Sequence, residues 1–267
     1  MAAYYNEFDP KTAAWLRELI KRNLIAPGDV DERSIKEVQP DDLRGYTQVH
    51  LFAGIGGWSY ALRLASWPDD APVWSGSCPC QPFSPAGKRK GINDERHLWP
   101  EMRRLVAERR PAICFGEQVA GKDGRQWLTG VRADLETLGY AVGAADLCAA
   151  SVGAPIIRQR LFWVSCAAGS RSAETAAANE ESEGGRSESG RTYRPDSRRL
   201  SAWNESGDSE NDVIVCADGR RRRTQSELYP LAARIPGVVA FMRGYGNSIV
   251  PQVAAEFIQA YREARGG

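Results

Sequence analysis

The feature that most constrains the fold is a glycine-rich turn that joins a buried strand to a helix. Residues 47–52 read as the strand and residues 58–67 as the helix, with the run Phe52-Ala53-Gly54-Ile55-Gly56-Gly57 between them. Glycines let the backbone approach a ligand closely, and dinucleotide or adenosyl ligands bind where such a turn follows a parallel strand. A simple tight turn would also use these glycines, so this motif alone does not decide between the two.

The remaining pattern alternates strands and helices. We expect strands at residues 72–77, 112–115, 140–147 and 161–166, and helices at 98–110, 126–138 and within 246–261. Residues 1–45 read as strand, helix and loop, with Asp9 as N-cap and Pro10 in the first helical position. This alternation predicts an α/β fold, a Rossmann-like and mostly parallel sheet with helices on both faces.

The composition changes at Ala167. From 169 to 212, Ser, Glu, Gly, Arg and Asn dominate, and such a stretch buries too little apolar surface to offset its chain entropy. We therefore expect residues 1–166 and 229–267 to form one domain and residues 167–228 a short, partly disordered insert.

Composition also excludes several classes. The sequence contains no run of about 18 apolar residues, so we expect no membrane span. The N-terminus lacks the pattern of a signal peptide. The six cysteines are scattered, which does not fit a disulfide framework. These features predict a cytoplasmic, reduced protein, and with a net charge of +1 any nucleic-acid binding must use a local basic surface.

An expected acid is missing after the glycine turn. In such folds, an acidic residue about 20 positions further on binds the ribose hydroxyls. Position 77 is Ser, and the nearest acids, Asp69 and Asp70, lie in a polar loop. Residues 58–79 suffice for one helix and one strand, so the next strand already leads into the turn that carries Cys80. The ribose-binding acid must come from elsewhere in the chain.

Six segments, taken in order, resemble the cytosine-C5 DNA methyltransferases of bacteria and phages. The resemblance covers residues 1–166 and 228–262. The glycine turn, continued by Trp58, resembles the family's S-adenosylmethionine loop. The other five segments are Pro79-Cys80-Gln81-Pro82-Phe83-Ser84, residues 94–99, Glu117-Gln118-Val119, residues 153–160 and residues 246–251. Gln118 and Ile156 depart from the family's usual Asn and Gln.

The resemblance implies transfer of a methyl group from S-adenosyl-L-methionine to C5 of a flipped cytosine in duplex DNA. Cys80 would form a covalent adduct at C6, and Glu117 would hydrogen-bond the base at N3 and its amine. Arg158 would stabilise the activated base, and Arg160 would be structural or phosphate-facing. Each residue also has a simpler reading. Cys80 could be a structural thiol or bind zinc together with Cys78, Glu117 could be a surface acid, and Arg158 and Arg160 could be solvated.

The resemblance also assigns binding residues. Besides the glycine loop and Trp58, the cofactor would contact Pro79, Asn247 and Ser248. DNA would contact Gln81, Ser84 and the basic loop residues Lys88, Arg89 and Lys90, although a solvated basic loop is the alternative reading. Residues 167–228 occupy the place of the family's target-recognition region.

Two further motifs precede the glycine loop, although in most of the family they follow it. Residues 6–14 resemble the second motif, an acid after a strand, and residues 28–31 resemble the third. The resemblance implies a rearranged chain order that leaves the same sheet in space. Glu7 would then bind the ribose, and Asp31, or less favourably Asp29, would face the adenine amine. An unrelated N-terminal helical hairpin is the alternative.

The expected partner is double-stranded DNA, with a cognate restriction enzyme as a second one. We expect a monomer in the cytoplasm of a bacterial or phage-infected cell. Two rival functions stay open on the sequence alone: a catalytically weak DNA-binding relative, and an RNA-directed C5 methyltransferase.

Overall fold

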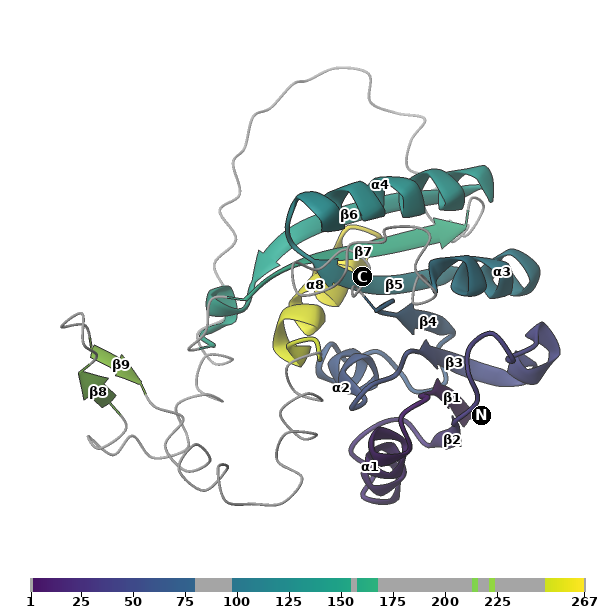
Figure 1. The fold of residues 1–267 in the computed structure, drawn as a ribbon, viewed down its shortest axis with the longest axis horizontal. Coiled ribbons are helices and arrows are strands. Elements are labelled where there is room, and N and C mark those ends of the chain that lie inside the picture. The colour runs from purple at the N-terminus through teal and green to yellow at the C-terminus, as the bar shows by residue number, and fades with distance from the viewer. Residues whose placement is uncertain are drawn as a thin grey trace.

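The computed structural model describes residues 2–79, 98–154, 158–167 and 248–266, and the backbone of 213–215 and 221–223. Its centre is a seven-stranded sheet of order β2-β1-β3-β4-β5-β7-β6 (Figure 1). Strands β1 to β5 run parallel, and β7 is antiparallel to both of its neighbours. The predicted α/β class is therefore confirmed. The strands are β1 (Ala2–Asn6), β2 (Gly28–Asp31), β3 (Tyr46–Leu51), β4 (Val73–Gly76), β5 (Ile113–Val119), β6 (Tyr140–Cys148) and β7 (Gln159–Ala167).

Helices cover both faces of the sheet (Figure 1). One face carries α1 (Pro10–Lys21), α2 (Gly57–Leu64) and α8 (Pro251–Glu263), and the other carries α3 (Trp99–Arg109) and α4 (Lys122–Thr137). Short 3-10 helices lie at η1 (Pro40–Leu43) and η4 (Ala149–Val152), and β8 (Val213–Val215) pairs with β9 (Arg221–Arg223). Among the described residues, no helix has the length and apolarity needed to cross a membrane.

The start of α1 follows the predicted pattern. The Asp9 carboxylate accepts hydrogen bonds from the Thr12 amide at 2.9 Å and the Thr12 hydroxyl at 2.6 Å, and Pro10 is the first helical residue. This capping satisfies an amide that the helix itself leaves unpaired, so the chain turns sharply after β1 into α1.

Three sequence-based boundaries were wrong. Residues 28–31 form a strand where we expected a loop, because parallel pairing with β1 supplies the order that four residues with two aspartates do not signal. Strand β5 pairs over its whole length with residues 160–166 of β7, from Ile113–Cys166 to Val119–Arg160. Glu117 and Arg160 consequently lie inside strands, whereas we had placed Glu117 after one and Arg160 before one.

The N-terminal strands complete the sheet beside the glycine loop. β1 lies between β2 and β3, with Asn6 paired to Asp31 on one side and to Leu51 on the other. This excludes the N-terminal helical hairpin and confirms that the rearranged order leaves one sheet. The connection from β1 leads outward to β2, and that from β3 leads the other way to β4. The crevice at which strand order reverses, where ligands bind in such sheets, therefore lies between β1 and β3.

The rearrangement changes the hand of one crossover. Tyr5 of β1 packs against Leu16 of α1 and hydrogen-bonds Ser59 of α2, so both helices cover the same face. The crossover β1–α1–β2 runs across the sheet in one direction, and β3–α2–β4 runs in the other. Because both pass over the same face, the two crossovers have opposite hands. The α3 crossover runs in the same direction as that of α2 but on the other face, where Met102 packs with Trp74. Because about 98% of such crossovers are right-handed, β3–α2–β4 is the exception.

Candidate active site

Glu7 joins the rearranged N-terminal segment to the glycine loop. It directly follows β1, and its Oε2 accepts a hydrogen bond from the Gly54 amide at 2.8 Å while Oε1 accepts one from the Asp9 amide at 2.9 Å. The Ala53 amide also donates to the Asn6 carbonyl at 2.9 Å. Burial raises the pKa of the Glu7 carboxyl, and these amides partly offset the rise. An acid 47 residues before Gly54 thus sits at the strand crevice.

The glycine loop needs its glycines for two reasons. Gly54 and Gly56 have φ values of 55° and 83°, in the left-handed region that favours glycine. At Gly57 a Cβ atom would lie 2.8 Å from Ile249 Cγ1, so only glycine allows the segment before α8 to pack there. Phe52 also has a positive φ, 53°, which costs a non-glycine residue roughly 1–2 kcal/mol. Such strain commonly accompanies a binding loop.

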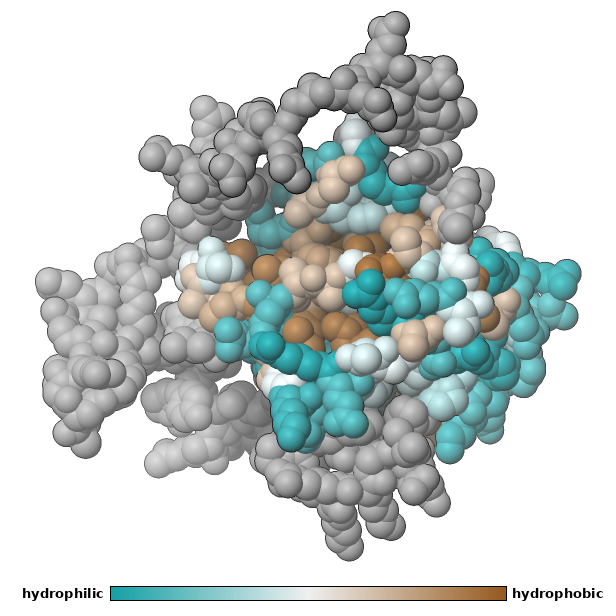
Figure 2. Space-filling model, turned by 90° about the horizontal axis from the view of Figure 1, so that it is seen from above, coloured by the Kyte–Doolittle hydropathy of each residue, from teal (hydrophilic) through white to brown (hydrophobic). Residues whose placement is uncertain are grey.

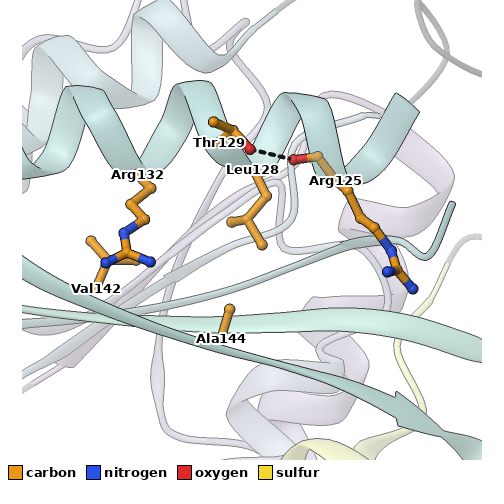
Figure 3. A pocket seen from close by; sticks show the side chains of 6 residues that line it. All are labelled: Arg125, Leu128, Thr129, Arg132, Val142 and Ala144. Atoms are coloured by element: carbon orange, nitrogen blue, oxygen red, sulfur yellow. Dashed lines mark hydrogen bonds between the residues drawn. The ribbon is translucent and has the colours of Figure 1, made fainter. Parts of the chain in front are cut away.

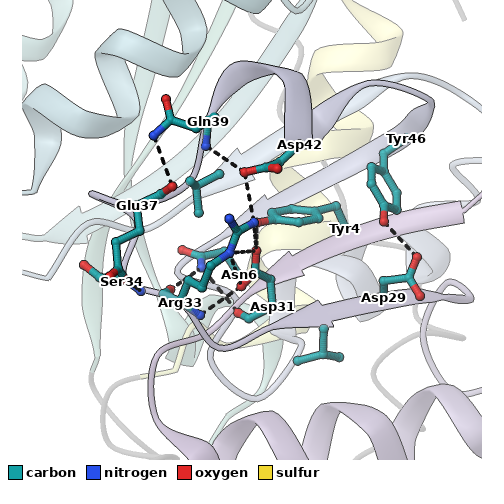
Figure 4. Close-up of polar contacts among 12 residues, drawn as sticks. Tyr4, Asn6, Asp29, Asp31, Arg33, Ser34, Glu37, Gln39, Asp42 and Tyr46 are labelled. Carbon is teal, nitrogen blue, oxygen red and sulfur yellow. Dashed lines mark hydrogen bonds and ion pairs between the residues drawn. The ribbon is translucent and has the colours of Figure 1, made fainter.

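The two candidate acids of β2 occupy different places. Asp31 ends the strand at the crevice edge and accepts hydrogen bonds from the Tyr4 hydroxyl at 2.6 Å and from Arg33 Nη2 at 2.7 Å. The same guanidinium group contacts Asp42 at 2.9 Å (Figure 4). Burial alone would raise the pKa of Asp31, but the Arg33 and Tyr4 hydrogen bonds hold it below its usual value.

Asp29 lies two residues earlier in β2. Its Oδ2 accepts a hydrogen bond from the hydroxyl of Tyr46, the first residue of β3, at 2.8 Å (Figure 4). Asp29 is therefore directed toward the beginning of β3, whereas the glycine loop follows the end of that strand.

Phe8 is a candidate site residue that the sequence analysis did not single out. It stands between Glu7 and Asp9 at the carboxyl edge of β1, and it is 71% exposed, more than any other large hydrophobic side chain that the structure describes. An exposed aromatic ring beside the crevice offers a flat apolar surface to a ligand ring. The available signal was an aromatic residue directly after the strand-end acid.

Glu117 of β5 is buried beside two partly buried arginines, Arg160 of β7 and Arg158 just before that strand. Glu117 is 7% exposed, and its Oε1 lies 2.8 Å from Arg160 Nε. Burial raises the pKa of the Glu117 carboxyl above its usual value, while Arg160, Arg158 and the Ser77 hydroxyl act to lower it. A carboxyl group with a raised pKa can hold a proton closer to neutral pH and can donate it to a bound base.

The segment before α8 contacts both parts of the site. Arg158 Nη2 donates to the Ser248 carbonyl at 2.7 Å, and Ser248 lies beside Gly57 of the glycine loop. Ser248 therefore links the glycine loop to Arg158. Asn247 lies outside the described residues.

The cysteine turn is described as far as Pro79, which is exposed. Cys80, Gln81, Ser84, Lys88, Arg89 and Lys90 lie outside the described residues. Cys78 is buried, its thiol lies 4.0 Å from the Met102 sulfur, and burial raises its pKa strongly. Cys78 is thus a core thiol, and the described residues contain no group of metal-ligating side chains. The burial of the Cys78 thiol disfavours its use as a zinc ligand with Cys80.

Two hydrogen bonds hold the start of this turn. Trp58 Nε1 of α2 donates to Ser77 Oγ at 3.0 Å, and Gln118 Nε2 of β5 reaches the Cys78 carbonyl at 3.5 Å. Gln118 Oε1 also accepts from the Val119 amide at 3.0 Å. Gln118, in the place of the family's Asn, therefore connects β5 to the turn.

On the side viewed in Figure 2, hydrophobic residues occupy the middle of the described surface and hydrophilic residues border it.

A shallow hollow of about 160 Å³ lies away from the candidate site, between α4 and the edge strand β6 (Figure 3). The two arginines of the hollow are paired, Arg125 with Asp146 at 2.9 Å and Arg132 with Glu136 at 2.6 Å. Because β4, β5 and β7 separate β6 from the glycine loop, this hollow is not part of the site. Its lining residues are Arg125, Leu128, Thr129, Arg132, Val142 and Ala144.

Comparisons with known proteins place the chain beside one family of methyltransferases. The model of the C-5 cytosine-specific DNA methylase family matches residues 66–197. Type II methyltransferase M.AplI of Arthrospira platensis is 39% identical, over 38% of this chain and 29% of that protein. M.HhaI of Haemophilus parahaemolyticus is 28% identical over 48% and 51%, and M.BanI of Aneurinibacillus aneurinilyticus is 28% identical over 70% and 44%. The matches thus span about half or less of each relative's length.

A solved structure, that of the S. pombe Dnmt2 methyltransferase, aligns over 99% of both chains with a TM-score of 0.50 and 13% identity. This likeness concerns the fold alone. The sheet order, the glycine loop and the acid at the strand crevice define a Rossmann-like methyltransferase fold. Together with the sequence matches, they support the cytosine-C5 DNA methyltransferase family, whose cofactor is S-adenosyl-L-methionine.

Proposed function

We propose that this chain transfers a methyl group from S-adenosyl-L-methionine to C5 of cytosine in duplex DNA. The observation that carries the proposal is the hydrogen bond between Glu7 and Gly54. This bond joins two segments whose chain order is unusual at the sheet edge where Glu117 also lies, and it supports a cofactor crevice there. The catalytic domain would comprise residues 1–166 and 229–267.

The residues at the crevice fit the cofactor chemically. Each Glu7 oxygen accepts one backbone amide and keeps a lone pair for a ribose hydroxyl. The exposed Phe8 ring would stack on the adenine, and Asp31 would accept its amine. Asp29 is the weaker candidate because it is directed toward Tyr46. The remaining cofactor contacts would come from Phe52, Ala53, Gly54, Ile55, Gly56, Gly57, Trp58, Pro79, Asn247 and Ser248.

The bound cofactor supplies an electrophilic methyl group, and the chain's own residues activate the base. The Cys80 thiolate bonds to C6 of a flipped cytosine while Glu117 protonates N3, which makes C5 nucleophilic. After C5 takes the methyl group, N3 would return its proton to the Glu117 carboxylate and a water molecule would accept the C5 proton. The electron pair of the broken C5–H bond would re-form the double bond between C5 and C6 and expel the Cys80 thiolate. Arg158 would stabilise the activated ring, and Arg160 would hold Glu117 through its ion pair.

The finer assignments rest on the family resemblance. Gln81, Ser84, Lys88, Arg89 and Lys90 would contact the displaced base and the phosphates, and residues 167–228 would read the DNA sequence. We propose a monomer that acts in the cytoplasm of a bacterial or phage-infected cell, with a cognate restriction enzyme as its functional partner.

Radiolabelled methyl transfer with the full chain tests the proposal. We expect incorporation into duplex DNA by the wild type and none by Cys80→Ala. Cys78→Ala is the matched control, since Cys78 is a buried thiol two residues away, and it should retain activity if it folds. DNA that contains 5-fluorocytosine should trap a covalent complex with the wild type. Methylation by Cys80→Ala would refute the mechanism, and transfer to tRNA but not to DNA would reassign the substrate.

A further inference from the structure

We propose that Ser77 is a positioning residue for Glu117, and that the Trp58 indole orients the Ser77 hydroxyl for this task. The inference rests on the proposed function, in which Glu117 contacts the base. Ser77 directly follows β4 and stands three residues before Cys80. The relay therefore connects the helix after the glycine loop to the carboxyl group that activates the base.

The direction of the hydrogen bonds follows from the groups involved. An indole N–H can only donate, so Ser77 Oγ accepts from Trp58 Nε1 across the 3.0 Å that separates them. The single Ser77 proton must then point elsewhere. Trp74 pairs with Cys114 and Ser75 with Phe115, and the same register continued by two residues sets Ser77 beside Glu117, whose carboxylate can receive the proton. Because Trp58 is buried, at 5% exposure, water does not compete freely for this arrangement.

The sheet places Ser77 and Arg160 on opposite flanks of Glu117. In strand order β5 lies between β4 and β7. Ser77 approaches from the β4 side, and Arg160 approaches from β7 with its Nε 2.8 Å from the carboxylate. Arg158 is the other charged group that acts on Glu117. A carboxyl group held from two sides has few rotamers left, as presenting one edge to a base requires.

The relay also links cofactor and base. Trp58 is the second residue of α2, directly after the Gly57 position that packs on Ile249. A shift of the glycine loop would move the Trp58 indole and, through Ser77, the Glu117 carboxyl. A hydrogen bond is stronger in a low-dielectric interior than in water. Because Trp58 and Glu117 are both buried, the hydrogen bonds through Ser77 are expected to couple them strongly.

A nuclear magnetic resonance titration tests the relay without requiring activity. The full chain is labelled with ¹⁵N-tryptophan, and the Trp58 indole signal is assigned through Trp58→Phe. We expect this signal to shift with pH as Glu117 titrates, and the inflection to vanish in Glu117→Gln and in Ser77→Ala. Ser77→Thr, which keeps the hydroxyl, should restore it. No inflection in the wild type, or an unchanged one in Ser77→Ala, would overturn the proposal.

Single-turnover methylation provides the second readout. We expect Ser77→Ala to slow methyl transfer about tenfold and to move the limb of the pH profile that reports Glu117 toward higher pH. The KM for the cofactor should stay within about twofold, since Ser77 acts on the base side. Ser77→Thr should recover the rate, and in the Glu117→Gln background Ser77→Ala should add nothing.

The two proposals fail in distinguishable ways. If the wild type does not methylate DNA, the proposed function fails, while the Trp58 titration still decides the relay. If Cys80-dependent methylation is intact and both the rate and the pH profile of Ser77→Ala equal those of the wild type, the relay alone is refuted. Circular dichroism and thermal unfolding of each variant establish that it is folded.

Discussion

The two halves of the sheet are built in different ways. The cofactor half, β1 to β3, takes its strands from segments whose order departs from that of most of the family, whereas the half that carries Glu117 and Arg160 keeps the usual motif order. Both halves nevertheless end their parallel strands at one edge. Strand pairing and burial depend on position in the sheet and not on the order of connection, so the crevice survives the rearrangement.

In the cofactor half, the new chain order changes the connections between the strands. The exceptional hand of the α2 crossover coincides with arginine contacts at the carboxyl end of that helix. Arg63 Nη1 donates to the Asn23 carbonyl at 2.6 Å, and Arg262 Nη1 donates to the Ala65 carbonyl at 2.8 Å. Cations near the end of a helix stabilise its unpaired carbonyls. These contacts bind α2 to the segment after α1 and to α8.

The largest expected effect lies in the base half. Glu117→Gln keeps the shape of the side chain but removes the proton donor, so we expect the methylation rate to fall at least about 100-fold. Cofactor affinity should stay within about twofold, because the cofactor half is untouched. Rapid-quench methylation and calorimetric titration with S-adenosylmethionine measure the two quantities. A large loss of cofactor affinity would show that the halves are not separable.

The converse change lies in the cofactor half. Glu7→Gln removes the charge that accepts the Gly54 amide and places an amide NH₂ where only an acceptor fits. We expect the dissociation constant for S-adenosylmethionine to rise about tenfold, with the single-turnover rate at saturation within about threefold. Glu18→Gln, an exposed acid on α1 paired with Arg22, is the control and should bind normally. Unchanged binding by Glu7→Gln would remove Glu7 from the site.

The seam between the halves should respond to pH. His50 is buried on β3, hydrogen-bonded to Ser75 of β4 at 2.8 Å and stacked on Tyr5 of β1, and burial lowers its pKa to about 3. The unfolded chain, with an ordinary histidine pKa of about 6.5, binds this proton first. Stability is therefore lost as pH falls from about 6.5 toward 3, by up to about 1.4 kcal/mol per pH unit.

Denaturant unfolding of the wild type and His50→Gln between pH 4 and 7 measures this contribution. The variant should show a shallower fall in the free energy of unfolding over that range. Parallel curves would mean that other groups dominate the acid sensitivity and that His50 does not report the seam.

The smallest expected effect concerns the adenine end. Arg33→Ala frees Asp31 from its ion pair, and because the carboxylate loses its orientation we expect cofactor affinity to fall about threefold. Arg33→Lys should recover only part of it, since an ammonium group cannot reproduce the paired contacts of the guanidinium. Calorimetric titration detects the change, and tighter binding by Arg33→Ala would show that Arg33 competes with the adenine for Asp31.

Several parts of the site were predictable because local sequence encodes them. The glycines of residues 54–57 meet a backbone requirement, the Asp9-Pro10 pair caps a helix, and apolar runs mark the central strands. The four-residue strand β2 and the full length of β5 and β7 were not predictable, because neighbouring strands supply their order. Phe8 and Ser77 carry no motif, and their interest arises from an exposed ring and from a hydrogen bond to Trp58.

By itself, the sequence determined the chemistry that this chain carries: the glycine loop, the cysteine turn, Glu117 and the absence of an acid at the end of the strand that leads to Cys80. Only the tertiary structure decided that β1 pairs between β2 and β3 and that the Glu7 carboxylate accepts the Gly54 amide. It also decided that the α2 crossover takes the unusual hand. Motifs are local and survive a change of order, but a strand's neighbours are long-range choices. They depend on which faces can be buried together once the whole sheet has formed.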